Sequence, residues 1–516
     1  MRSFAQAHVD GWTNGEIILS ESIDRHAFLA GACGIALAGC GGTDVMTKVL
    51  TRPRVTGAPI PRKLSQAIRG PVIERGAPGF LAAAHVYNER FDNVLPQAVA
   101  RPLDATDVRG AVRWAVAHDV ALRARSGGHS YAGYSVLSGG VVLDLRNLRG
   151  ISVNHRAGTA VIGAGAQLID VYTAMAGQGF TIPAGSCPSV GIGGHALGGG
   201  MGLAGRAFGL LTDNLIGAQL VTADGRVRTV NAHTDADLLW ALRGGGGGNF
   251  GVVTQLQVRL HKLPRVASYF FVNWPWSSAS QALNAWLDWA PHTLDGLSSV
   301  FHLETGSAQP QVNVAGQYNG PASDLRRLLA PLTSAGGGSM TVGNQDYIGL
   351  QTRWAGCLGR SLQSCHTVGT RAGGQLERAS FNAKSDYVTR PLSQAGRQVL
   401  VSAIEARQGQ TGSGAILFDS YGGAINRIAP AATAFVHRNA LACIQYLAYN
   451  GGSPWLGQTH ARMRPYVSGM AYQNYIDPAL NGWQKAYYGN NYARLLATRR
   501  RVDPDHHFNF PQAIGR

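Results

Sequence analysis

Three glycine-rich segments lie close together in the first half of the chain, and they limit its fold more than any other feature. They span residues 125–133, 185–200 and 243–253, and each follows an apolar strand-like or helix-like stretch. Glycine lets a backbone turn sharply and approach a ligand closely, so that N–H groups can converge on an anion such as a pyrophosphate. One such segment can be only a flexible turn. Three together predict a backbone wrapped around one large ligand with an anionic bridge.

Single residues argue against two familiar motifs. Residues 161–168 begin like a dinucleotide-binding fingerprint, but Leu168 stands where a third small residue is needed for close packing of helix on strand. Residues 128–132 resemble the nucleophile elbow of hydrolases, but Ala132 replaces its final glycine. The sequence therefore favours neither a Rossmann domain nor a serine hydrolase.

Hydrophobic periodicity predicts an α+β fold. Strands are expected at residues 141–145, 160–162 and 252–256, and helices at residues 107–118 and 235–242. Later in the chain, a strand-like stretch near residue 269 precedes amphipathic segments at residues 280–289 and 391–406. This order predicts a sheet flanked by helices in the second half of the protein.

The same periodicity divides the chain into five parts. A leader at residues 1–40 and a linker at 41–77 precede a first domain at 78–265, a second domain at 266–469 and a C-terminal segment at 470–516.

The leader has the features of an export signal. Arg25 and His26 precede an apolar stretch at residues 28–37 that is too short to span a bilayer and ends in Leu-Ala-Gly-Cys at Cys40. This ending resembles the lipobox at which bacterial lipoproteins are cleaved and lipidated. We therefore expect an exported protein, extracellular or held at the cell surface by a lipid on Cys40. A buried apolar helix is the alternative.

Charge and cysteine content exclude other classes of function. The net charge is +16, but the basic residues are scattered and no nucleic-acid-binding motif accompanies them. Cys357 and Cys365 could form a disulfide outside the cytoplasm, and their spacing is not that of a metal site. Cys443 lies in an apolar stretch, and we interpret it as a small core residue. We expect neither a nucleic-acid partner nor a metal.

Two of the glycine-rich segments carry the motifs of a known family. Residues 126–131 read Ser-Gly-Gly-His-Ser-Tyr, and residues 185–188 read Gly-Ser-Cys-Pro. Over about residues 80–516 the chain resembles the berberine bridge enzyme-like branch of the vanillyl-alcohol oxidase or PCMH flavoprotein superfamily. The resemblance implies a two-part flavin adenine dinucleotide (FAD)-binding domain and a substrate domain. It also implies a flavin bonded covalently through its 8α-methyl carbon to His129 and through its ring carbon 6 to Cys187.

The resemblance also assigns roles to other residues. In the C-terminal segment, residues 472–477 are similar to the family's Tyr-x-Asn-Tyr-x-Asp strand, which makes Tyr475 the expected general base. Asp419 and Tyr131 are the other expected catalytic residues. The expected cofactor-binding residues are Arg125, Ser126, Gly127, Gly128, His129, Ser130, Cys187, Val190, Gly193, Gly194, His195, Asn249, Gly251, Val253 and Asn490.

These roles predict an oxidase that acts on an alcohol. Tyr475 would take the substrate hydroxyl proton, hydride would pass to flavin N5, and dioxygen would become hydrogen peroxide. An unperturbed tyrosine has a pKa near ~10, so a cation or strong donor would have to lower the pKa of Tyr475. Val190 is the smaller residue typical of the family's oxidases, and carbohydrates or other alcohols are the expected substrates. Leu417 is apolar where some sugar-oxidising relatives are polar.

Three alternatives share this scaffold. A dehydrogenase would use another electron acceptor, a redox-neutral cyclase would form no peroxide, and a surface flavin-binding protein would not turn over. The sequence gives no information on oligomeric state.

Overall fold

The computed structural model describes residues 64–516. The expected leader, the candidate lipid anchor Cys40 and the linker up to residue 63 lie outside the described residues. Among residues 64–516, no helix has both the length and the apolar character needed to cross a membrane.

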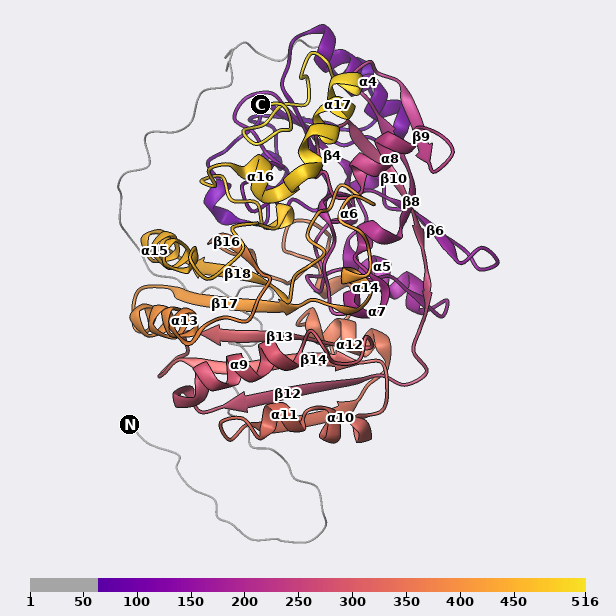
Figure 1. Cartoon of the computed structure of the whole chain (residues 1–516). Helices are drawn as coiled ribbons and strands as arrows, with labels where there is room; N and C mark the ends of the chain where they lie inside the picture. Colours follow the sequence, from indigo (N-terminus) through magenta and orange to yellow (C-terminus); the bar gives the residue numbers. More distant parts are fainter. Residues whose placement is uncertain (1–63) are drawn as a thin grey trace, which may run out of the picture.

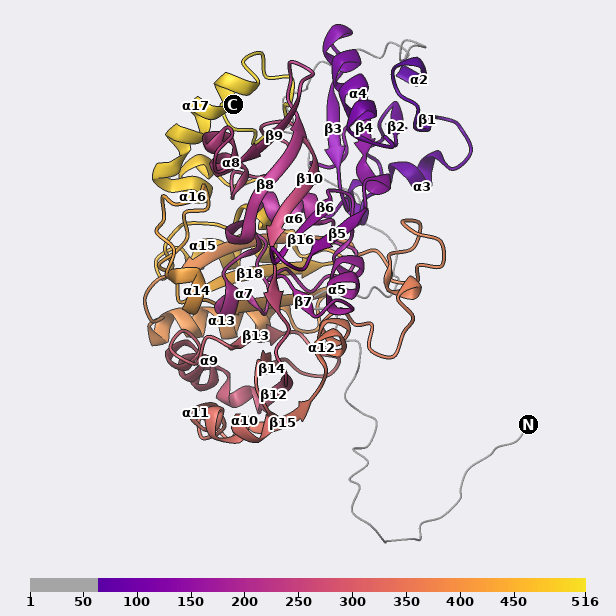
Figure 2. The same cartoon turned by 90° about the vertical axis from the view of Figure 1, so that its right-hand side faces the viewer.

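The N-terminal half of the described chain forms a four-stranded sheet, a five-stranded sheet and the two-stranded pair of β7 (Phe180–Thr181) and β11 (His261–Lys262) (Figure 2). The four-stranded sheet has the order β1 (Val72–Glu74), β2 (Ala98–Ala100), β4 (Val141–Asp144), β3 (Leu122–Arg125). The five-stranded antiparallel sheet has the order β5 (Ile151–Asn154), β6 (Thr159–Gly163), β10 (Val252–Arg259), β8 (Leu215–Val221), β9 (Val227–Asn231). The three strands expected from the sequence correspond to β4, β6 and β10.

The two predicted helices of the N-terminal half are present, and a capping side chain explains where each begins. Helix α4 (Ala105–Ala117) begins after Asp104, whose carboxylate accepts hydrogen bonds from the N–H groups of Thr106 and Asp107. Its apolar positions then recur at helical spacing and are buried. Helix α8 (Ala236–Leu242) begins in the same way after Asp235, whose side chain accepts from Leu238 N–H.

The second half of the chain forms one seven-stranded antiparallel sheet, which crosses the lower part of Figure 1. Its order is β15 (Ser339–Asn344), β12 (Ser268–Trp274), β14 (Gln311–Tyr318), β13 (Leu297–Glu304), β17 (Ser413–Ser420), β18 (Ala442–Tyr449), β16 (Phe381–Val388). Helices α9 (Ala279–Trp289), α13 (Gln394–Arg407) and α15 (Ser453–Met463) pack on one face.

Alternation along the strands separates the two faces of this sheet. Phe301, Phe418 and Ile444 point into the core beneath the helices. Leu417 and Asp419 point to the opposite face, where they line a cavity. This arrangement follows from the period of two in a strand, and it makes an α+β protein with a sheet flanked by helices, as the sequence predicts.

The C-terminal segment returns to the N-terminal sheets. Helix α17 (Tyr492–Val502) lies beside α8, and α16 (Trp483–Tyr488) packs on α17; both are yellow in Figure 1. Asn249 in the third glycine-rich segment accepts hydrogen bonds from Arg499 through its backbone carbonyl (2.8 Å) and from Ile514 N–H through its side chain (2.9 Å). The end of the described chain is therefore part of the core that supports this segment.

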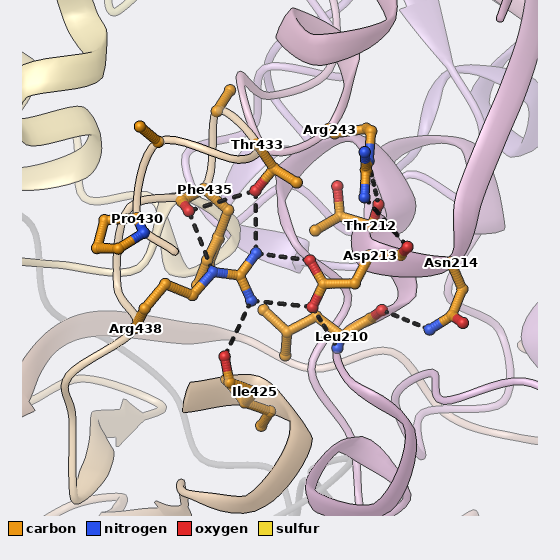
Figure 3. Close-up of polar contacts among 12 residues, drawn as sticks. Leu210, Thr212, Asp213, Asn214, Arg243, Ile425, Pro430, Thr433, Phe435 and Arg438 are labelled. Atoms are coloured by element: carbon orange, nitrogen blue, oxygen red, sulfur yellow. Dashed lines mark hydrogen bonds and ion pairs between the residues drawn. The ribbon is translucent and has the colours of Figure 1, made fainter. Parts of the chain in front are cut away.

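A buried ion pair joins the two halves of the chain (Figure 3). Arg438 contacts both carboxylate oxygens of Asp213, at 2.6 and 2.9 Å, and donates to Thr433 Oγ1 at 2.9 Å. Arg243 donates to the backbone carbonyls of Thr212 and Asp213. The guanidinium of Arg438 thus ties the 433–438 segment to the turn that precedes β8.

Candidate active site

A cavity of about 360 Å³ lies between the glycine-rich segments and the open face of the seven-stranded sheet. All three segments contribute to it, together with residues from β13, β17, β18 and the 472–476 stretch. The three segments therefore surround one site, as their common composition predicts.

Most of the residues singled out in the sequence line this cavity. They are Ser126, Gly127, Gly128, His129, Ser130, Tyr131, Cys187, Val190, Gly193, Gly194, His195, Gly251, Val253, Asp419 and Tyr475.

Three of the expected cofactor-binding residues lie elsewhere. Arg125 is buried behind the first segment, where it donates to Asp144 Oδ2 (2.9 Å) and to backbone carbonyls. Asn249 donates to Gly245 O (2.9 Å) and supports the third segment from behind. Asn490 is exposed, whereas its neighbour Asn491 is buried and donates to Pro430 O (2.8 Å). The side chains of Arg125 and Asn249 support the cavity walls from behind, whereas Asn490 lies at the surface.

Two glycines allow the first and second segments to touch. A Cβ atom on Gly127 would collide with the backbone of Gly191, and a Cβ atom on Gly191 would collide with Gly127 N and Ser126 Oγ. A Cβ on Gly194 would instead meet nothing within 4 Å. The backbone here is packed on one side and open on the other, which is what a cradle for a large ligand requires.

His129 is held by two neighbours. Its ring stacks on Tyr87 with centroids 4.1 Å apart, and its Nε2 lies 2.9 Å from Ser189 Oγ. Burial lowers the pKa of His129 to about 3, with a smaller contribution from His195. The imidazole is therefore neutral at physiological pH and keeps a lone pair on one ring nitrogen.

Cys187 and His195 belong to the second segment. Cys187 is half-buried on the cavity wall. His195 Nε2 accepts a hydrogen bond from Gly185 N–H at 2.8 Å, and burial lowers its pKa to about 4. A neutral His195 is the acceptor that this backbone N–H needs, so it fixes the turn that carries Cys187.

Tyr475 and Asp419 meet at the sheet side of the cavity. The Tyr475 hydroxyl donates to Asp419 Oδ2 at 3.5 Å, and the Tyr131 ring stacks on Tyr475 with centroids 5.3 Å apart. Burial raises the pKa of Asp419 to about 7, an effect that His302 and the Tyr475 hydrogen bond reduce.

The pKa of Tyr475 differs from the sequence expectation. Burial, and then the negative charge of Asp419, raise this pKa well above its ordinary value, whereas the expected role required it to be lowered. The reasons are that the hydroxyl is buried and that its neighbour is a carboxylate rather than a cation. Tyr475 consequently stays protonated, and the group that titrates near neutral pH is Asp419.

Two polar residues of the cavity were missed in the sequence. Gln445 Nε2 donates to Tyr131 Oη at 2.6 Å. His302 lines the cavity and pairs through Nδ1 with buried Glu304 at 3.0 Å. Both sit in largely apolar strands, and only the register of β13 and β18 against β17 shows that they face the site.

The disulfide considered from the sequence is formed. Cys357 and Cys365 are bonded, with their Cα atoms 5.7 Å apart, and they close a turn beside α5 (Leu168–Ala176). Cys443 is fully buried in a cluster with Tyr387 and Tyr421, as expected of a small core residue.

Comparison with known proteins assigns this architecture to a class. Residues 96–231 match the family described as "FAD binding domain", and residues 471–515 match "Berberine and berberine like". With the cavity, these two matches define an FAD-dependent oxidoreductase of the PCMH type.

Individual relatives cover most of the chain. An uncharacterized FAD-linked oxidoreductase of Bacillus subtilis strain 168, YgaK, is 32% identical over 449 residues, which are 83% of this chain and 94% of the relative. The solved structure of Physcomitrella patens BBE-like 1 is 31% identical, with a TM-score of 0.80, covering 87% of this chain and 98% of that one. A chitooligosaccharide oxidase is 28% identical with a TM-score of 0.79, covering 87% and 98%. The chain belongs to the berberine bridge enzyme-like FAD-linked oxidoreductases.

The residues around the cavity fit FAD. The open side of Gly194 and the N–H groups of the glycine-rich turns suit a pyrophosphate. A neutral imidazole and a thiol, both on the wall, are nucleophiles that suit an electron-poor ring.

Proposed function

We propose that this protein is an exported FAD-dependent oxidase that carries its flavin on both His129 and Cys187 and oxidises an alcohol. One observation carries the proposal: the two nucleophiles line the same cavity as Tyr475 and Asp419. The export signal expected from the sequence of residues 25–40 supports the exported location. The division into units at residues 78–265, 266–469 and 470–516 is part of the proposal, supported by the change of sheet between β11 (His261–Lys262) and β12.

The protein would hold FAD through the three glycine-rich segments and the two covalent attachments. When bound, FAD supplies a two-electron acceptor at N5 and returns the electrons to dioxygen as hydrogen peroxide. His129 and Cys187 fix the position of the ring, so that the cavity can stay open toward the substrate.

Proton transfer is the task of Tyr475 and Asp419. The substrate hydroxyl proton passes to Tyr475 Oη as the tyrosine proton passes to Asp419 Oδ2. Asp419 can accept it at neutral pH because its pKa is about 7. Tyr475 therefore needs no phenolate of its own, since it relays the proton over the 3.5 Å hydrogen bond. Tyr131, held by Gln445, would lie against the substrate ring.

Dioxygen is the proposed electron acceptor. Support comes from Val190, a small side chain on the cavity wall three residues after Cys187. A dehydrogenase with another acceptor is the alternative on the same scaffold.

Two substrate classes are favoured by different observations. The similarity to a chitooligosaccharide oxidase supports a carbohydrate. The wall formed by Leu417, Phe381 and Leu447 is apolar and supports an aromatic alcohol. A panel that contains chitobiose, xylobiose and cinnamyl-type alcohols separates the two classes.

The test has two parts. Acid-precipitated protein should stay yellow, and substrate added without oxygen should bleach the flavin, with peroxide formed once air is admitted. Release of all flavin into the supernatant would refute covalent attachment. Flavin that stays oxidised with every compound would refute alcohol oxidation by this panel, and bleaching without peroxide in air would indicate a dehydrogenase.

A further inference from the structure

Two buried hydroxyl groups continue from the ring of His129. His129 Nε2 lies 2.9 Å from Ser189 Oγ, and Thr367 Oγ1 donates to Ser189 Oγ at 2.7 Å. Ser189 and Thr367 are 2% and 1% exposed. Neither residue is needed for the proton transfer proposed above.

Two distant parts of the sequence supply these hydroxyls. Ser189 lies between Cys187 and Val190 in the second glycine-rich segment. Thr367 comes from the loop between α12 (Tyr347–Trp354) and β16, two residues after the disulfide that ends at Cys365.

This loop is fastened to the N-terminal sheets by charge. His366 Nε2 and Arg371 Nη2 each lie 3.0 Å from the carboxylate of Asp170, on helix α5. The backbone of the loop also pairs, with Val368 N–H donating to Leu376 O at 2.9 Å. Thr367 is therefore presented to Ser189 by a cross-linked and anchored loop.

The chemistry of the imidazole gives this arrangement a purpose. A neutral histidine has its proton on one ring nitrogen and its lone pair on the other. Among residues 64–516, no hydrogen-bond acceptor is seen for Nδ1, whereas Ser189 Oγ stands beside Nε2. Thr367 Oγ1 donates to Ser189 Oγ, so Ser189 can either donate its own proton to the Nε2 lone pair or accept the Nε2 proton, and only the second arrangement leaves the lone pair on Nδ1. Attack through Nδ1 therefore needs the arrangement in which Ser189 Oγ accepts the Nε2 proton.

We infer that Ser189, supported by Thr367, is a positioning residue for covalent attachment of the flavin: it accepts the Nε2 proton of His129 in a hydrogen bond and so presents the Nδ1 lone pair to the flavin methyl carbon. The inference rests on the proposed attachment at His129. The C–N bond forms as one C–H bond of that methyl group and the Nε2–H bond are lost as protons. The two electrons released pass to the flavin and then, with two protons, to dioxygen as hydrogen peroxide.

Trypsin makes the test direct. Cleavage after arginine places His129 on the peptide of residues 126–146 and Cys187 on the peptide of residues 157–206. A flavin attached at both positions joins the two peptides into one species. A flavin attached only at Cys187 leaves the peptide of residues 126–146 unmodified, and mass spectrometry distinguishes the two products.

Ser189→Ala and Thr367→Val are the informative variants. Protein purified after a short induction is incubated with FAD in air and sampled over time. We expect the joined peptides to form at least about tenfold more slowly in Ser189→Ala, and several-fold more slowly in Thr367→Val, since a hydrogen bond to a group that becomes charged is lost. Flavin on the Cys187 peptide should appear at the wild-type rate.

The controls separate the inference from its premise. Thr367→Ser keeps the hydroxyl and should attach flavin normally, as should Ser364→Ala, which removes a different buried hydroxyl from the same loop. Wild-type protein without joined peptides would refute attachment at both residues. Joined peptides at the wild-type rate in both Ser189→Ala and Thr367→Val would refute the role of Ser189 alone. An equal loss at both peptides would indicate a merely structural role and also overturn the inference.

Discussion

At the scale of single residues, the proposed mechanism depends on where one proton goes. Tyr475 and Asp419 share it, and burial affects them unequally: the tyrosine keeps its proton, and the carboxyl group titrates near pH 7. The expectation that Tyr475 must lose its own proton arose because the sequence does not show which side chain lies beside its hydroxyl.

Replacing Asp419 with Asn keeps the shape of the side chain but removes the proton acceptor. We expect flavin reduction to slow by about 10²–10³-fold, within the range that positioned general bases contribute. Anaerobic stopped-flow measurement with the best substrate of the panel gives this rate. Flavin content should match the wild type, and a reduction rate within about threefold of wild type would show that Asp419 is not the acceptor.

The raised pKa of Asp419 predicts a pH dependence with a definite sign. The ionised carboxylate accepts the proton, so the reduction rate should rise as pH increases through about 7 and level off above it. Below that pH the rate should fall about tenfold per unit. Asp419→Asn should lose this dependence, and a wild-type profile that stays flat through pH 7 would contradict the assignment.

At the scale of elements, the close approach of two glycines joins the first and second glycine-rich segments. Gly191→Ala places a methyl group against Gly127 N and Ser126 Oγ. The segments must separate to admit it, so we expect the flavin content of the purified protein to fall severalfold, measured as the ratio of flavin to protein absorbance. Gly457→Ala, in helix α15 with no atom within 4 Å of the added carbon, is the matched control and should keep full flavin content.

Local patterns in the sequence predicted several elements but not their partners. The strands at β4, β6 and β10 and the helices α4 and α8 follow from periodicity and from caps such as Asp104. Gln445 could not be assigned in this way, because its position opposite Leu417 depends on the pairing of β17 with β18. Strand order is set by contacts between distant residues, which a local pattern does not contain.

At the scale of the whole molecule, the buried pair Arg438–Asp213 connects the two halves. Replacing Arg438 with Met would leave Asp213 buried without its cation, and we expect the free energy of unfolding to fall by about 3–5 kcal/mol. Arg501→Ala breaks a more exposed pair with Asp235 and should cost about 1 kcal/mol or less. Thermal or urea unfolding compares the two variants. Equal losses in the free energy of unfolding would contradict the larger contribution expected of the Arg438–Asp213 pair.

The location of the site was partly predictable at this scale. The glycine-rich segments and the motif around Tyr475 identified the residues that meet at the cavity. The positions of Arg125 and Asn249 behind the cavity walls, and of Asn490 at the surface, were not foreseen. A motif places a residue near a ligand without showing which way its side chain points.

The hydrogen bond from Ile514 N–H to the Asn249 side chain has a consequence for how the protein is made. Synthesis runs from the N-terminus, so the third glycine-rich segment leaves the ribosome long before the residues that support it. The third glycine-rich segment can reach its final form only after residue 514 has emerged from the ribosome. Cofactor loading should therefore follow translation rather than accompany it, and a chain that stops early would be left with an incomplete site, however well its first sheets have folded.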